Sequence, residues 1–181
     1  MIKWNKRKAR GKETVKMGQP IEWVTHPLDP IFNERSEILI LGSFPSVASR
    51  EAAFYYGHPQ NRFWRVLAEI FGKPLPTSND ERRKLILSNG LALWDVIASC
   101  RIRGSADNAI TDVVPNDLSK FLADAPIQKI IVNGRTAEKY YLKFQYTKTG
   151  ILPTVLPSTS PANAAWSIEK LTDAWREAVR G

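Results

Sequence analysis

Four short apolar runs, each followed by a polar or glycine-containing turn, alternate along this chain with segments of helical periodicity. The runs span residues 37–42, 91–96, 129–132 and 153–156. A continuous apolar run is typical of a strand covered on both faces, as in a parallel sheet. Strands that alternate with helices favour a sheet flanked by helices, so we predict an α/β fold.

Helices are predicted between these strands and after the last one. The segment 61–71 places its apolar residues on one stripe, which Gly72 ends. A second helix begins where Ser78 and Glu81 have the spacing of a capping box, and it ends near Gly90. Three further helices are predicted at residues 117–124, 136–144 and 167–179, the last with Ser167 as its N-cap.

Length and composition limit the classes of protein to consider. A chain of 181 residues with 43% hydrophobic content can bury one core, so we expect a single domain. One cysteine, Cys100, excludes an internal disulfide, and two histidines leave little for a metal site. We expect no metal, no cofactor and a reducing, cytoplasmic setting. Neither an 18-residue apolar run nor the apolar region of a secretory signal occurs.

The net charge of +8 is concentrated at the N-terminus. Residues 1–18 carry a net charge of +6, which leaves only +2 for the remainder. This basic segment could bind phosphates through counterion release, or it could be a solvated tail without a partner. We predict a flexible tail at 1–18 and one domain over 19–181, and the charge alone does not decide the function.

In folds of this class the ligand lies beyond the carboxyl ends of the strands. Four segments follow strands in this way, at residues 42–61, 95–107, 133–135 and 157–163. The first begins Gly42-Ser43-Phe44-Pro45-Ser46, where backbone N–H groups can face an anion or a carbonyl oxygen. A plain connection remains the alternative reading. The spacing matches neither a P-loop nor a dinucleotide fingerprint.

Aromatic residues are dense at 54–64. Three consecutive aromatics at 54–56 cannot all be buried on one face, so we expect one to be available for stacking. Phe63 and Trp64, on the predicted helix, are expected in the core. His58 precedes a proline, and a structural role is the preferred reading for it.

A stiff loop rich in small residues follows the last strand, with the sequence Pro157-Ser158-Thr159-Ser160-Pro161-Ala162-Asn163. Its hydroxyl groups can reach phosphates, and a rigid loop can press into a DNA groove and help a base to leave the stack. Taken alone, it is also consistent with a plain loop that leads to a capped helix.

Together these segments resemble the uracil-DNA glycosylase superfamily, over roughly residues 37–180. The run Gly-His-Pro-Gln-Asn-Arg-Phe-Trp at 57–64 is similar to a motif of the mismatch-specific enzymes. Those enzymes have an asparagine where this chain has Phe44, and phenylalanine cannot orient a water molecule. Gly-Ser-x-Pro, His-Pro-x-Asn and Pro-Ser-Thr-Ser-Pro-Ala-Asn together resemble the hypoxanthine-DNA glycosylase branch.

The resemblance implies a fold and a set of roles. It implies a three-layer α/β/α fold whose four-stranded parallel sheet has the order 2-1-3-4, with Asn61 as the catalytic residue. Asn61 would hold a water against C1′ of the deoxyribose, and backbone N–H groups of 43–46 would receive O6 of hypoxanthine while Tyr56 stacks on the ring. Asp95 could accept from N1–H, although bracing a loop is the simpler role. The implied base-binding residues are Gly42, Ser43, Phe44, Pro45, Ser46, Tyr56 and Asp95.

The C-terminal loop is expected to contact DNA. Ser158, Thr159 and Ser160 would bind flanking phosphates, and the residues that would wedge the duplex are Pro161, Ala162 and Asn163. Alanine is a smaller plug than the leucine common in the superfamily.

We therefore expect a monomeric, monofunctional glycosylase that acts on double-stranded DNA containing a damaged base, with hypoxanthine as the first choice. We expect no membrane partner, and association with the nucleoid if the source is bacterial. Three alternatives stay open: a mismatch-specific uracil or ethenocytosine glycosylase, a non-catalytic DNA-binding module, and a flavodoxin-like small-molecule binder.

Overall fold

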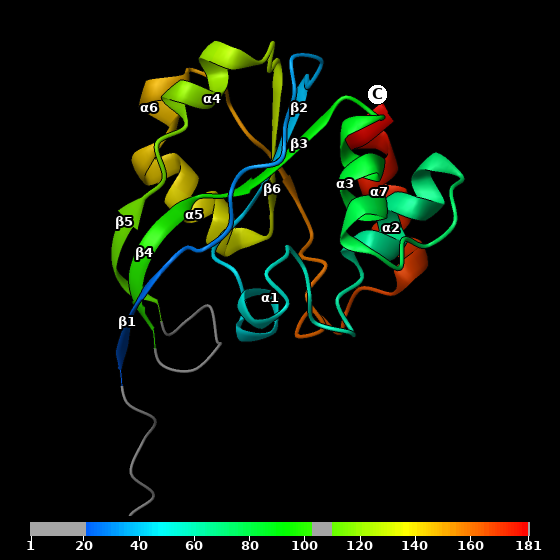
Figure 1. The fold of residues 1–181 in the computed structure, drawn as a ribbon, viewed down its shortest axis with the longest axis horizontal. Coiled ribbons are helices and arrows are strands. Elements are labelled where there is room, and N and C mark those ends of the chain that lie inside the picture. Colours follow the sequence, from blue (N-terminus) through cyan, green and yellow to red (C-terminus); the bar gives the residue numbers. More distant parts are fainter. Residues whose placement is uncertain (1–20, 103–109, 181) are drawn as a thin grey trace, which may run out of the picture.

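The computed structural model describes residues 21–102 and 110–180. Its centre is a parallel sheet of four strands: β2 (Ile38–Gly42), β3 (Leu91–Asp95), β6 (Lys129–Asn133) and β7 (Thr154–Leu156), in the order β3-β2-β6-β7 (Figure 1). All three pairings are parallel. The predicted order of the four strands is confirmed, and their predicted bounds differ by one residue at most.

Helices cover both faces of this sheet. On one face lie α2 (Phe63–Phe71), α3 (Asn79–Leu87) and α7 (Ile168–Arg180), and on the other lie α4 (Ser119–Asp124), α5 (Arg135–Phe144) and α6 (Tyr146–Thr149) (Figure 1). Strand β2 contributes to two hydrophobic cores. Ile40 packs in the core on the side of α2, α3 and α7, whereas Leu39 and Leu41 pack in the core on the side of α4 and α5. Alternate side chains of a strand point to opposite faces, so a sheet buried on both sides needs a continuous apolar run.

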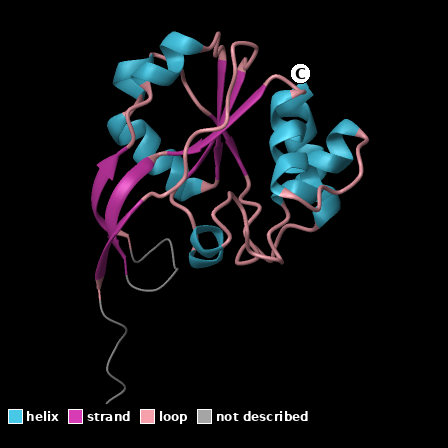
Figure 2. Cartoon of the chain, in the orientation of Figure 1, coloured by secondary structure: helices cyan, strands magenta, loops and turns pink. Residues whose placement is uncertain are grey.

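A second sheet was not predicted from the sequence. Strands β1 (Glu22–Thr25), β4 (Ile97–Ile102) and β5 (Thr111–Pro115) form an antiparallel sheet in the order β1-β4-β5 (Figure 2). The segment 95–107 was expected to follow a strand without forming one itself. This is wrong for residues 97–102, because β4 starts two residues after β3 ends. The short helix α1 (Val47–Glu51) was also missed.

The helix ends follow the local sequence. Gly72 ends α2 in the left-handed conformation, with φ of 61°. Ser78 and Glu81 form the predicted capping box of α3, and Ser167 Oγ accepts a hydrogen bond from Lys170 N at the start of α7. Within the described ranges, no helix is long and apolar enough to cross a membrane. The basic segment 1–18 and residues 103–107 of the predicted segment 95–107 lie outside the described residues.

Candidate functional site

A pocket of about 520 Å³ opens at the carboxyl ends of the central strands. We call it the central pocket. Twelve of the fourteen residues singled out from the sequence line it, so segments far apart in the chain do meet. The twelve are Gly42, Ser43, Phe44, Pro45, Ser46, Tyr56, Asn61, Asp95, Ser158, Thr159, Ser160 and Ala162. Their roles stay predictions, because lining a pocket does not by itself establish a role.

Gly42 and Asp95 form the floor of the central pocket, as register partners at the ends of β2 and β3. A Cβ added to Gly42 would lie 2.2 Å from Asp95 Oδ1 and 3.2 Å from the Tyr56 hydroxyl oxygen. Real Cβ atoms essentially never come within 3.0 Å of another atom, and 3.2 Å is already a tight contact. Glycine at position 42 therefore leaves the space in which the Asp95 carboxylate and the Tyr56 hydroxyl group lie.

The turn after β2 is held from several sides. Gly42 O and Ser43 O accept hydrogen bonds from Val96 N at 2.9 Å and Ile97 N at 3.1 Å. Ser46 accepts from Ser49 N and caps α1. Phe44 is buried and stands edge-on to the His26 ring, so it forms an apolar wall of the pocket and not a site for water.

Only the last of the three consecutive aromatics at 54–56 is partly exposed. Phe54 and Tyr55 are buried, and the Tyr55 hydroxyl donates to Asp29 O at 2.8 Å. Burial raises the pKa of Tyr55 above its ordinary value. Tyr56 lines the pocket with φ of 52°, and one face of its ring stacks on Phe63 at 3.9 Å between centroids. The expected division between core and accessible aromatics is confirmed.

Asn61 lies where the loop enters α2. Its Oδ1 accepts a hydrogen bond from Phe63 N at 3.0 Å, and its own backbone N–H donates to His58 O at 2.8 Å. These two bonds fix the amide group at the edge of the central pocket. His58 Nδ1 accepts from Gln60 N, which is consistent with the structural reading of this histidine.

Arg62 joins the motif at 57–64 to the C-terminal loop. Its guanidinium donates to Thr159 O at 3.3 Å and, through one nitrogen, to Ser160 O at 2.6 Å and Asn163 O at 3.0 Å. It also donates to Trp166 O. A planar guanidinium has five N–H donors in a fixed geometry, so one side chain can organise the carbonyl groups of a whole loop.

Pro161 and Asn163 are the two predicted residues outside the lining of the central pocket. Asn163 Nδ2 donates to Ser158 O at 2.9 Å, which braces the loop internally. Asn163 also lines a neighbouring pocket of about 670 Å³, together with Arg135 and Trp166. Ser158, Ser160 and Ala162 line both pockets, so the loop lies between them.

The geometry agrees with comparisons to known proteins. Residues 30–179 match the family described as the Uracil DNA glycosylase superfamily. The chain belongs to this superfamily. A protein named Hypoxanthine DNA glycosylase from Methanosarcina barkeri is 35% identical over 153 residues, which cover 83% of this chain and 95% of the relative. A second, from Methanosarcina acetivorans, is 36% identical over 152 residues, covering 83% and 94%.

A solved structure of this superfamily is also similar. The solution NMR structure of a proposed uracil DNA glycosylase from Methanosarcina acetivorans is 33% identical to this chain and has a TM-score of 0.74. The match covers 86% of this chain and 96% of that one.

Sequence reasoning missed several residues in and beside the central pocket. Asn133 and Thr136 line the central pocket, and the only signal for them was the position of Asn133 at a strand end. Ile102, from the unpredicted β4, and Ile110 add an apolar side. His26 contacts the Asp95 carboxylate at 2.9 Å, and no local pattern indicates such a pairing. Within residues 21–102 and 110–180, no three His, Cys, Asp or Glu side chains lie close enough together to hold a metal ion.

Proposed function

We propose that this protein is a DNA glycosylase that flips a deaminated base out of duplex DNA, hydrolyses its N-glycosidic bond and leaves an abasic site. Hypoxanthine is the base we favour. The observation that carries the proposal is the meeting of three segments, around Gly42, Asn61 and Thr159, in one pocket at the strand ends. The names of the two similar Methanosarcina proteins support the choice of base.

The central pocket suits an extrahelical purine. Its volume of about 520 Å³ falls within the range typical of small-molecule sites. In the proposed complex, O6 of hypoxanthine accepts hydrogen bonds from backbone N–H groups of the turn at 43–46. Tyr56 contributes its ring, already held by Phe63, to stack on the base. An ordered platform binds the base without first losing side-chain entropy.

In this proposal, Asn61 holds the attacking water in position. Glycosidic cleavage develops positive charge on the sugar, and a dissociative path needs an oriented water more than a strong base. A carbonyl oxygen has two lone pairs, so Asn61 Oδ1 can accept from a water as well as from Phe63 N. Donors aimed at the departing base then stabilise the negative charge that develops on it.

The C-terminal loop would hold the DNA. Ser158 and Ser160 offer hydroxyl groups for the flanking phosphates, whereas Pro161, Ala162 and Asn163 would enter the duplex where the base leaves. The hydrogen bonds from the Arg62 guanidinium to the loop support this role, because a loop that wedges between base pairs must be stiff. We further propose that the protein acts as a monomer.

Base release from a defined duplex tests the function. The protein, in excess, is incubated with duplex DNA containing one deoxyinosine, and the strand is then treated with alkali. A monofunctional glycosylase gives strand scission only after this treatment. If no scission follows for either deoxyinosine or deoxyuridine, the proposal fails.

A uracil-specific enzyme is the second candidate, favoured by the similar solved structure that is described as a proposed uracil DNA glycosylase. The same assay on duplexes containing deoxyuridine, paired and mismatched, separates the two. Release of uracil without release of hypoxanthine would replace our choice of base and keep the reaction.

A further inference from the structure

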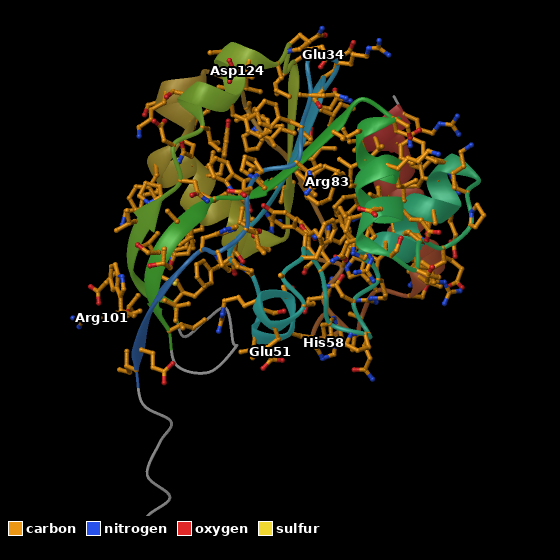
Figure 3. All side chains as sticks on the ribbon, in the orientation of Figure 1. Glu34, Glu51, His58, Arg83, Arg101 and Asp124 are labelled. Atoms are coloured by element: carbon orange, nitrogen blue, oxygen red, sulfur yellow. The ribbon has the colours of Figure 1, made fainter. Side chains whose placement is uncertain are left out.

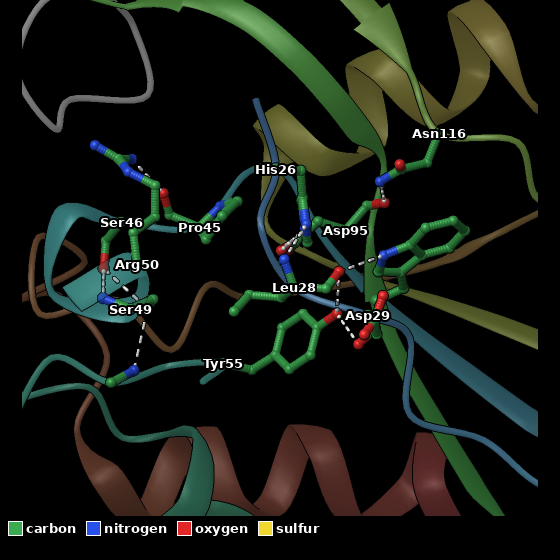
Figure 4. A network of polar contacts seen from close by, with 12 residues as sticks. His26, Leu28, Asp29, Pro45, Ser46, Ser49, Arg50, Tyr55, Asp95 and Asn116 are labelled. Carbon is green, nitrogen blue, oxygen red and sulfur yellow. Dashed lines mark hydrogen bonds and ion pairs between the residues drawn. The ribbon is translucent and has the colours of Figure 1, made fainter. Parts of the chain in front are cut away.

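A histidine and a carboxylate are paired at the floor of the central pocket. His26 Nε2 lies 2.9 Å from Asp95 Oδ2, and the two side chains are only 3% and 6% exposed (Figure 4). His26 follows β1 and precedes the residues, 30–179, that match the superfamily. It therefore reaches the site from a part of the chain that the family match does not include.

The hydrogen bonds around His26 fix the position of its proton. Leu28 N–H donates to Nδ1 at 3.1 Å, so Nδ1 carries the lone pair and the proton is on Nε2. Nε2–H therefore donates to Asp95 Oδ2. The backbone also holds the residue, since His26 N donates to Ala98 O at 2.6 Å, and the Phe44 ring stands edge-on at 5.9 Å.

This donation orients the second carboxylate oxygen. While Oδ2 is held by His26, Oδ1 leans over Gly42, at 2.2 Å from the position that a Cβ there would take. Gly42 and Asp95 both line the central pocket. Asp95 Oδ1 is therefore an acceptor directed over the floor on which a base would lie.

Deamination reverses the hydrogen-bonding pattern that such an acceptor detects. Adenine has a lone pair at N1 and an amino group at C6, whereas hypoxanthine has N1–H and a carbonyl oxygen. Cytosine and uracil differ in the same way at N3 and C4. An ionised carboxylate accepts hydrogen bonds and donates none, so it attracts the ring N–H of the product and repels the lone pair of the parent base.

We infer that His26 is a positioning residue for base specificity, which holds Asp95 so that Oδ1 accepts the ring N–H that deamination creates. This rests on the proposed function, because it concerns the base that enters the same pocket. Donation from His26 also disperses part of the carboxylate charge beside the departing base. Guanine carries the same N1–H, so the pair separates a base from its deaminated product and not one purine from all others.

Binding to uncleavable bases tests the inference apart from catalysis. Duplexes carry a single 2′-fluoroarabino nucleotide, with either hypoxanthine or adenine, because the fluorine destabilises the sugar cation and blocks hydrolysis. The quantity measured is the ratio of the two dissociation constants. The cost of flipping each base belongs to the DNA, so it cancels when a variant is compared with the wild type.

The variants form a double-mutant cycle. We expect Asp95→Asn and His26→Phe each to reduce the preference for hypoxanthine by about 10- to 100-fold, the range for loss of a specific hydrogen-bonded base contact. His26→Gln places an amide N–H where Nε2 lies and keeps most of the preference. The double variant H26F/D95N matches Asp95→Asn alone, because His26 acts only through Asp95.

Controls separate specificity from stability. Ser36 Oγ donates to Leu91 O at 3.0 Å, at the opposite end of β3 from Asp95. Ser36→Ala loses a comparable buried hydrogen bond, and we expect a lower melting temperature with an unchanged ratio. If His26→Phe fails to fold, His26→Asn replaces it, because its amide reaches the position of Nδ1 and not that of Nε2.

An unchanged ratio in the His26 variant, or losses that add in the double variant, would overturn the inference. A wild type that releases hypoxanthine or uracil from ordinary duplexes would in that case leave the proposed function standing. A wild type that releases neither base would overturn both.

Discussion

Asn133 and Thr159 exchange two hydrogen bonds. Thr159 N–H donates to Asn133 Oδ1 at 3.0 Å, and Asn133 Nδ2 donates to Thr159 Oγ1 at 3.0 Å. Asn133 ends β6, while Thr159 is fully buried in the loop after β7. The amide group has one donor side and one acceptor side, so the pair fixes the loop at 158–162 relative to the sheet in one orientation.

Replacing Asn133 with alanine removes both bonds at once. The buried N–H and hydroxyl of Thr159 would lose their partner, and we expect the free energy of unfolding in urea to fall by about 1–3 kcal/mol. Base excision should slow as well, because the loop lines the central pocket. Thr159→Val removes only the hydroxyl and should cost less. Equal stabilities of Asn133→Ala and the wild type would show that the pair contributes nothing.

Arg62→Lys tests whether Arg62 holds the C-terminal loop through the geometry of its hydrogen bonds or through its charge. Lysine keeps the positive charge, but its single ammonium nitrogen cannot replace both Nη1, which donates to Trp166 O, and Nη2, which donates to Ser160 O and Asn163 O. We expect excision to slow by at least about tenfold, equivalent to a loss of about 1.4 kcal/mol, and backbone amides of residues 158–166 to exchange hydrogen faster.

Arg65→Lys is the matched control for this change. Arg65 is exposed on α2, the helix that begins directly after Arg62, and its partner is Glu69 at 3.1 Å. An exposed ion pair of this kind contributes little. If the backbone amides of residues 158–166 exchange hydrogen at the same rates in Arg62→Lys and Arg65→Lys, the hydrogen bonds from Arg62 do not hold the loop.

Cys100 gives the fold a dependence on alkaline pH. It is fully buried in β4, and burial raises the pKa of its thiol above the ordinary value of 9.0. The folded state then keeps a proton that the unfolded chain releases. Its contribution to stability is complete below pH 9.0 and is lost as the pH rises towards the folded-state pKa. The stability difference between wild type and Cys100→Ala should therefore shrink above pH 9.0. A constant difference would contradict this.

The parallel sheet could be predicted because its strands are covered on both faces. Burial of both faces of β2 requires an apolar residue at every position, and this leaves an unbroken run in the sequence. The position of each turn after a strand then indicated where the pocket would form. Recognition of the motifs indicated which polar residues to expect there.

The second sheet and the bracing side chains left no comparable signal. Strand β4 begins two residues after β3 ends, and its pairing with β5 is interrupted by register shifts, so its alternation is irregular. Arg62 contacts carbonyl groups 97–104 residues away, and His26 contacts a carboxylate 69 residues away. Such contacts form only in the completed fold, where side chains from distant segments pack between the helices and the sheet (Figure 3), and no local sequence pattern indicates them.

Asn61→Ala should impair the chemical step more than DNA binding. The alanine variant loses the group that we propose to orient water, so we expect single-turnover excision to slow by about 100- to 1,000-fold. It also loses the hydrogen bond that Asn61 Oδ1 accepts from Phe63 N, at the first residue of α2, which is worth about 1 kcal/mol. Urea unfolding of Asn61→Ala measures that structural loss separately from the excision rate. If alanine at 61 leaves the excision rate unchanged, the water is held elsewhere.

Gly42→Ala should damage the central pocket through a steric clash of the added methyl group and not through strain in the backbone. The new methyl group would meet Asp95 Oδ1 at 2.2 Å, so the carboxylate must move off the pocket floor. Gly72→Ala provides the contrast: φ is 61° there, which strains an alanine, but no atom lies within 4 Å of the added carbon. We expect both variants to lose about 1 kcal/mol or more of stability, measured by urea unfolding. Only Gly42→Ala should also lose affinity for duplexes with an uncleavable hypoxanthine, and equal affinities for the two variants would show that Asp95 can move without consequence for the base.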